Sequence, residues 1–224
     1  MSLRRMITSI VVFCCILFLD APARAQVVCD QDFGQPAQSV YRLPYAVGRT
    51  CTCILSYCAP EPDNRHHGLF AYDFGLALGD TVTAIRGGLV YALRETDPDG
   101  TGEYHRTNYI SVEHEDGTVC VYGHLTRFGV LVDIGDTIAA GQPIGLAGYS
   151  GLPADAPPCI HVEVLIDRYH WDNEDSLPFN FCNAQGPLDA NGGLIGGQVY
   201  LALDPNQVAT ETRSWGDVKS EYRP

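Results

Sequence analysis

Short runs of alternating apolar and polar residues, typical of β-strands, fill most of the chain after residue 73. Four runs rich in β-branched and aromatic residues are expected to be strands: residues 81–85, 89–93, 109–113 and 119–122. Turn-forming residues separate them, and Asp116-Gly117 between the last two runs is a strong hairpin signal. Outside the N-terminus no stretch has the period of a helix. The pattern predicts an all-β fold, an antiparallel β-sandwich or hybrid-motif domain with short hairpins.

A weak internal repeat lies within this region. Residues 79–84, Gly-Asp-Thr-Val-Thr-Ala, resemble residues 135–140, Gly-Asp-Thr-Ile-Ala-Ala. Because two copies are too few for a solenoid, we interpret them as parts of one domain built from two similar hairpin units.

The N-terminus has the three parts of a secretory signal. Arg4 and Arg5 precede an apolar run over residues 7–19, and Ala23-Arg24-Ala25 is a small-x-small cleavage site. We expect a signal peptide at 1–25, cleavage after Ala25, and a secreted or periplasmic protein. The apolar run is short for a membrane span, and an uncleaved anchor is the alternative. The remaining chain divides into a Cys-containing segment at 26–59, a β domain at 60–205 and a polar tail at 206–224. Residues 26–60 are expected to be irregular.

Charge and cysteine content narrow the possible partners. After cleavage the chain carries 11 basic and 26 acidic residues, a net charge of −15. This argues against binding to nucleic acid, which needs a cationic surface. Seven cysteines remain, at 29, 51, 53, 58, 120, 159 and 182. Export favours disulfides, and the odd number leaves at least one thiol that is free, binds metal or pairs between chains.

Three segments combine histidine or aspartate with strand-like surroundings. They contain His66, His67 and Asp73, then His124, and finally His161 with Cys159 and Glu163. Side chains on a strand alternate between faces, so residues 159, 161 and 163 share one face. Two imidazoles and a carboxylate brought together suit Zn²⁺, with a fourth position left for water.

An ordered series of short motifs over residues 60–165 resembles the lysostaphin-type (LytM-like) zinc metalloendopeptidases. The series includes Asp73-Phe74, Asn108-Tyr109-Ile110, Tyr122-Gly123-His124-Leu125 and His161-Val162-Glu163-Val164. The resemblance implies that Asp73, an upstream histidine and His161 bind the zinc, and that His124 stabilises the oxyanion or transfers a proton. Because His66 keeps a His-x-Gly pattern with Gly68, we favour it over His67 as the first ligand.

Cys159 departs from the family, which has a catalytic histidine at this position in an H-x-H motif. A neutral thiol cannot act as a cationic imidazole, whereas a thiolate binds zinc well. Cys159 is therefore either a catalytic-site residue, a fourth ligand that closes the site, or part of a disulfide. Glu163 is expected to orient a ligand or to lie exposed. His114, at the hairpin tip, is expected to be structural or solvated, and His105 and His170 to lie in loops.

The resemblance implies a zinc-dependent endopeptidase that hydrolyses peptide bonds of bacterial cell-wall peptidoglycan. The alternative is a catalytically impaired relative that binds the wall or a partner enzyme, with structural zinc or none. A disulfide-stabilised extracellular domain without metal is the third possibility.

Overall fold

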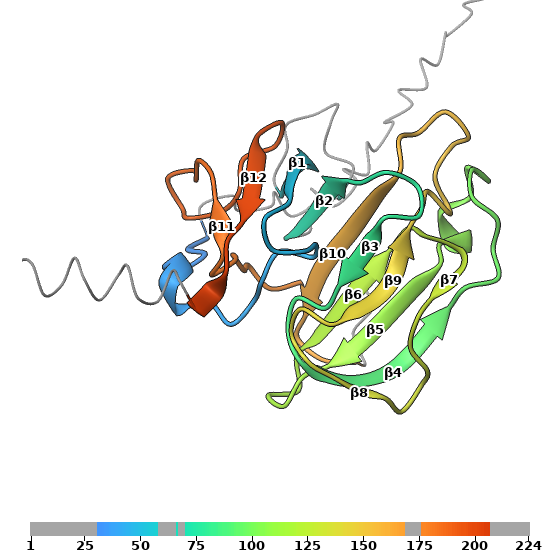
Figure 1. The fold of residues 1–224 in the computed structure, drawn as a ribbon, viewed down its shortest axis with the longest axis horizontal. Helices are drawn as coiled ribbons and strands as arrows, with labels where there is room; N and C mark the ends of the chain where they lie inside the picture. The colour runs from blue at the N-terminus through green and yellow to red at the C-terminus, as the bar shows by residue number, and fades with distance from the viewer. Residues whose placement is uncertain (1–30, 58–65, 67–69, 169–175, 207–224) are drawn as a thin grey trace, which may run out of the picture.

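The computed structural model describes residues 31–57, 66, 70–168 and 176–206, and within these it is built almost entirely of antiparallel strands (Figure 1). The predicted signal peptide and most of the polar tail lie outside the described residues. The strands are β1 (Thr50–Leu55), β2 (Ala71–Gly75), β3 (Thr81–Thr83), β4 (Gly88–Arg94), β5 (Tyr109–Glu113), β6 (Val119–Gly123), β7 (Leu125–Val130), β8 (Thr137–Ile138), β9 (Pro143–Ala147), β10 (Cys159–Leu165), β11 (Ala184–Gln185) and β12 (Val199–Ala202). Two 3₁₀ turns, η1 (Pro36–Gln38) and η2 (Tyr104–Arg106), complete the elements. The predicted all-β class is confirmed.

The strands form two sheets that enclose one core. The larger sheet has the order β11-β12-β1-β2-β10-β6-β5-β4-β8, and the smaller has the order β3-β9-β7. In Figure 1 the smaller sheet lies in front of β5, β6 and β10, and one buried cluster joins the two sheets through residues such as Ile144 and Ile160. The hydroxyl of Tyr122 on β6 also accepts a hydrogen bond from the Ile85 amide, 2.7 Å away, just after β3. Both sheets therefore support the central strands β2, β6 and β10.

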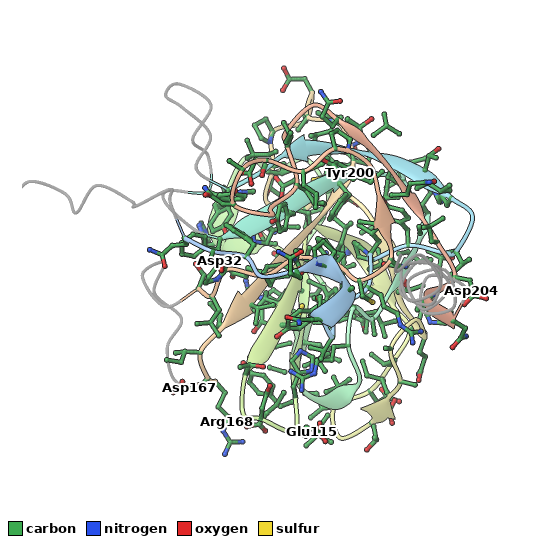
Figure 2. All side chains as sticks on the ribbon, turned by 90° about the vertical axis from the view of Figure 1, so that its left-hand side faces the viewer. Asp32, Glu115, Asp167, Arg168, Tyr200 and Asp204 are labelled. Carbon is green, nitrogen blue, oxygen red and sulfur yellow. The ribbon has the colours of Figure 1, made fainter. Side chains whose placement is uncertain are left out.

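The predicted hairpin is present. Residues Glu113 and Val119 pair across β5 and β6, and Gly117 adopts the positive φ of 82° that the Asp-Gly turn requires. Figure 2 places Glu115 at the lower end of the molecule, on the tip of this turn. His114, by contrast, is buried, and its Nδ1 lies 2.9 Å from the Gly87 carbonyl oxygen. Of the two expectations for His114, the structural one is correct.

The internal repeat is a repeated turn rather than a repeated hairpin unit. In each copy the aspartate carboxylate accepts a hydrogen bond from the amide three residues earlier, Ala77 for Asp80 and Asp133 for Asp136. The preceding glycine has a φ of 82° in the first copy and 97° in the second. The strands that follow diverge, because β3 joins the small sheet and β8 the edge of the large one.

The segment before the β domain is more ordered than expected. Residues 50–55 form β1, which pairs with β12 on one side and with β2 on the other. Cys51 and Cys53 point to the buried side of this strand, and in the part of the chain that the structure describes all five cysteines are free thiols. The expectation of disulfides is thus not supported there, and Cys29 and Cys58 lie outside the described residues. Thiols here behave as small apolar side chains that fill the core.

Among the described residues, no helix has both the length and the apolar character of a membrane span.

Candidate metal centre

Two neighbouring central strands bring the predicted ligands together. Asp73 on β2 and His161 on β10 are direct cross-strand partners, so their side chains share one face of the sheet. Nδ1 of His161 lies 2.8 Å from Oδ1 of Asp73, and Nε2 of His66 lies 3.1 Å from the same oxygen. One ligand atom from each of the three residues falls within 4.8 Å of the other two. His67, the other candidate, lies outside the described residues.

This face of β10 is the one turned away from the main core. Ile160, Val162 and Val164 belong to the core cluster, whereas His161 alternates with them on the opposite side. The apolar residues therefore anchor the strand, and the polar residues between them form the site.

Electrostatic coupling within the cluster is strong. Burial raises the pKa of Asp73, but the neighbouring His66 and His161 outweigh this effect and hold the pKa well below its usual range. Burial likewise lowers the pKa of His161, but the hydrogen bond with Asp73 and the nearby carboxylate of Glu163 raise the net pKa well above its usual value. The carboxylate of Asp73 is thus ionised and faces positive charge, which is the environment that a bound cation would also supply.

The donor atoms of the cluster fit a zinc ion. In the described part of the chain, both ring nitrogens of His66 are buried without a hydrogen-bond partner. Such orphaned polar atoms are rare in native proteins and call for an explanation such as an ion. Two imidazole nitrogens and one carboxylate oxygen are a ligand set that catalytic zinc sites use, with a further position left open.

Glu163 lies on the outer side of His161. Its Oε2 is 3.9 Å from Nε2 of His161, while Nδ1 of the same ring faces Asp73. A carboxylate on the far nitrogen of a metal-binding histidine fixes the orientation and tautomer of the ring. The side chain of Glu163 is only 15% exposed, so it does not lie exposed, and at 3.9 Å it is too far from Nε2 for a direct hydrogen bond; the orienting role stays a prediction.

His124 lies beside the cluster, at the corner between β6 and β7. Its ring centroid is 5.9 Å from that of His161, and its Nδ1 is 2.9 Å from the carbonyl oxygen of Ser150. Because a carbonyl oxygen can only accept, Nδ1 carries the proton and Nε2 carries the lone pair. Burial lowers the pKa of His124, which favours the neutral ring. The geometry leaves Nε2 as the nitrogen that can exchange a proton.

Cys159 is the first residue of β10 and lies on the same face as His161. The structure does not bring its sulfur into the cluster of His66, Asp73 and His161. The side chain is buried, and burial together with the nearby charge of Asp73 raises the pKa of the thiol. The raised pKa favours the protonated thiol, which carries no positive charge.

Sequence reasoning missed three neighbours of His124. Ser150 acts through its backbone carbonyl, which no side-chain pattern reveals, and Asn108 appeared in the motif series without a role. Tyr104 on η2 is 68% exposed, and its ring centroid lies 6.2 Å from that of His124. A lone tyrosine in a loop carries no sequence signal for such a contact.

Gly123 makes room for His161. The two residues are cross-strand partners on β6 and β10, and a Cβ added at Gly123 would lie 3.3 Å from Cβ of His161 and 3.6 Å from its Cδ2. The 3.3 Å distance is tighter than ordinary contact, so a side chain at Gly123 would displace the imidazole of His161 from its present position.

Gly123→Ala is expected to weaken zinc binding by about 10-fold, because small displacements of a positioned group have large effects on its function. A zinc titration of the two purified proteins measures this. Gly196→Ala is a matched control, since a Cβ there would meet only ordinary contacts with Ser56, 3.6 Å away at the nearest. Equal zinc affinity in Gly123→Ala and the parent chain would contradict the steric argument.

The fold and the site thus define an all-β domain that gathers two imidazoles and a carboxylate into a candidate metal site. Residues 65–173, nearly half of the chain, match the family model described as Peptidase family M23. The predicted family resemblance is thereby confirmed, and the family is one of metallopeptidases that hydrolyse peptidoglycan.

Solved structures of similar fold include several peptidases. The catalytic domain of the antimicrobial peptidase lysostaphin from Staphylococcus simulans is 23% identical, with a TM-score of 0.42 over 58% of this chain and 87% of that one. The M23 metalloprotease pseudoalterin from the deep sea is 15% identical, with a TM-score of 0.45 over 74% and 96%. A zinc-containing peptidase from Vibrio cholerae is 23% identical, with a TM-score of 0.38 over 57% and 37%. No curated protein matches the sequence significantly.

Proposed function

We propose that this chain is a zinc-dependent endopeptidase that hydrolyses peptide bonds of bacterial cell-wall peptidoglycan. The observation that carries the proposal is the cluster of His66, Asp73 and His161 with His124 beside it. The match to a metallopeptidase family supports the reaction class. The ordered motif series that resembles lysostaphin-type enzymes supports the substrate class.

The residues of the cluster divide the chemistry between them. Nε2 of His66, Oδ1 of Asp73 and Nδ1 of His161 would hold the ion. A bound zinc ion polarises a carbonyl group and lowers the pKa of its water to about 7. His124 keeps its proton on Nδ1 through Ser150, so it accepts a proton at Nε2 and delivers it to the leaving amine.

Cys159 favours a second candidate function. A buried, protonated thiol cannot supply the positive charge that an imidazolium offers to a developing oxyanion. On this ground the alternative is a catalytically impaired relative that holds zinc and binds wall peptides or a partner enzyme in the same place.

The proposed location of action is the periplasm or the cell exterior, where peptidoglycan lies. The predicted signal peptide at residues 1–25 supports this location.

His124→Ala separates the two candidates. If the chain is an enzyme, the variant keeps stoichiometric zinc but digests purified peptidoglycan roughly 100-fold or more slowly, since a positioned acid–base group contributes about 10²–10⁴-fold. Zinc content and release of soluble wall fragments are measured on the same samples. His105→Ala is the control, because the side chain of His105 is 78% exposed and lies in η2, outside the cluster. A zinc-loaded parent chain that releases no fragments would instead support the impaired relative.

A further inference from the structure

The backbone of His124 adopts a conformation that its neighbours must hold in place. Its φ of 65° lies in the left-handed region, which residues other than glycine seldom occupy. Such conformations persist only where the surroundings fix them, and they concentrate at functional sites. Here the surroundings fix the conformation of His124 through hydrogen bonds to the backbone of the next residue, Leu125.

Asn108 forms hydrogen bonds with both the backbone amide and the backbone carbonyl oxygen of Leu125. The Leu125 amide donates to the Asn108 carbonyl oxygen over 3.2 Å, and Nδ2 of Asn108 donates to the Leu125 carbonyl oxygen over 3.1 Å. Both residues are fully buried. A polar pair of this kind, shielded from water, restrains the chain immediately after His124.

Ser150 forms hydrogen bonds with all three residues, Leu125, Asn108 and His124. Its hydroxyl donates to the same Leu125 carbonyl oxygen over 2.7 Å and accepts from the Asn108 amide over 2.9 Å. Its carbonyl oxygen accepts from Nδ1 of His124. The hydroxyl of Ser150 therefore fixes the position of the carbonyl that selects the His124 tautomer.

The same asparagine also closes the loop that carries Tyr104. Oδ1 of Asn108 accepts from the Asp97 amide over 3.0 Å, and Nδ2 donates its second proton to the Asp97 carbonyl oxygen over 2.8 Å. The Asp97 carboxylate in turn binds Nε of Arg106 over 2.8 Å. One side chain thus ties together the His124 corner and the loop whose tyrosine contacts the His124 ring.

From this arrangement we infer that Asn108 and Ser150 are positioning residues that set the orientation and the tautomer of His124. The inference rests on the proposed function for its catalytic consequence, but its structural content stands on the hydrogen bonds alone. Neither side chain needs to touch the substrate, because both act through His124.

Asn108→Asp tests the inference with an isosteric change. An ionised carboxylate lacks the two protons of Nδ2, so it loses the bonds to the Leu125 and Asp97 carbonyl oxygens and faces them with negative charge. We expect kcat on a soluble wall peptide to fall roughly 10- to 100-fold with KM and zinc stoichiometry unchanged. In nitrogen NMR of the histidine rings, His124 is expected to change from one Nδ1-protonated tautomer to a mixture.

Ser150→Ala is the second variant, since removal of a hydroxyl perturbs folding less than a buried charge. The variant keeps the carbonyl oxygen that His124 binds but loses the hydroxyl bonds to Leu125 and Asn108 that hold this carbonyl in place. We therefore expect a smaller fall in kcat, of about 10-fold, together with the same change in the NMR signals of His124.

Asn183→Asp is the matched control. Asn183 is also buried and also joins two segments, accepting from the Leu43 amide over 2.8 Å and donating to the Leu203 carbonyl oxygen over 3.2 Å. It precedes β11 at the far edge of the sheet, so its loss is expected to lower stability without altering kcat or the His124 signals.

Unchanged His124 signals in folded Asn108→Asp and Ser150→Ala proteins would overturn the inference, as would an equal change in Asn183→Asp. These results remain distinct from a failure of the proposed function. A parent chain without wall-digesting activity overturns that function, whereas the comparison of ring signals still decides the roles of Asn108 and Ser150.

Discussion

His161→Ala is expected to abolish stoichiometric zinc binding. The substitution removes the ligand atom that lies 2.8 Å from Oδ1 of Asp73 and leaves only His66 and Asp73 in the cluster. Loss of an outer hydrogen-bond partner costs about 10- to 100-fold in metal affinity, so loss of a direct ligand is expected to cost more than about 100-fold.

Two measurements check this result. Zinc content after dialysis gives the stoichiometry, and thermal unfolding with and without zinc gives the linked stability. Free zinc at about 100 times its Kd stabilises the parent chain by about 2.7 kcal/mol, and this gain is expected to vanish in His161→Ala. His114→Ala serves as a control, because His114 is also buried but bonds to Gly87 instead. Retention of full zinc affinity by His161→Ala would refute the assignment of the cluster.

Cys159→His is expected to raise the rate of peptidoglycan hydrolysis by as much as about 100-fold. Loss of one group that stabilises an oxyanion costs about 10²–10³-fold in other enzymes, and this variant adds such a group on the face that carries His161. A neutral thiol with a raised pKa provides no comparable charge.

The larger size of the imidazole in Cys159→His is expected to oppose this gain, because the position is buried. Cys159 is 1% exposed, and overpacking a buried site costs about 1–3 kcal/mol, so the free energy of unfolding is measured alongside the rate. Cys159→Ala, which removes the thiol without adding an imidazole, is expected to keep zinc and to show no gain. A folded, zinc-loaded Cys159→His protein that hydrolyses no faster than the parent would favour the impaired relative.

Strand positions were predictable wherever the local pattern was complete. Residues 109–113 and 119–122 combine β-branched and aromatic residues with an Asp-Gly turn, and the structure places β5 and β6 there. β1 was missed because Thr50–Leu55 alternates threonine with cysteine, and the cysteines suggested disulfides rather than a strand. Its pairing with β12, about 150 residues later, is a long-range contact that no local pattern encodes.

In the candidate site, too, some features could be predicted from local sequence patterns and others could not. Asp73 and His161 were predictable because each stands in a motif on a strand, and antiparallel pairing then places them side by side. The support of His124 was not predictable, because it depends on a backbone carbonyl of Ser150 and on a left-handed corner. Neither feature requires a particular side chain at the position where it acts.

The pairing of Asp73 with His161 has a consequence for the order in which the domain matures. Both residues sit on interior strands whose spacing is set by backbone hydrogen bonds, so if the chain binds zinc as proposed, folding alone would already bring this pair together before the ion arrives. If the chain is also exported as proposed, it would remain folded but without its ion in a compartment poor in free zinc. The supply of the ion, rather than the rate of folding, would determine when it becomes competent.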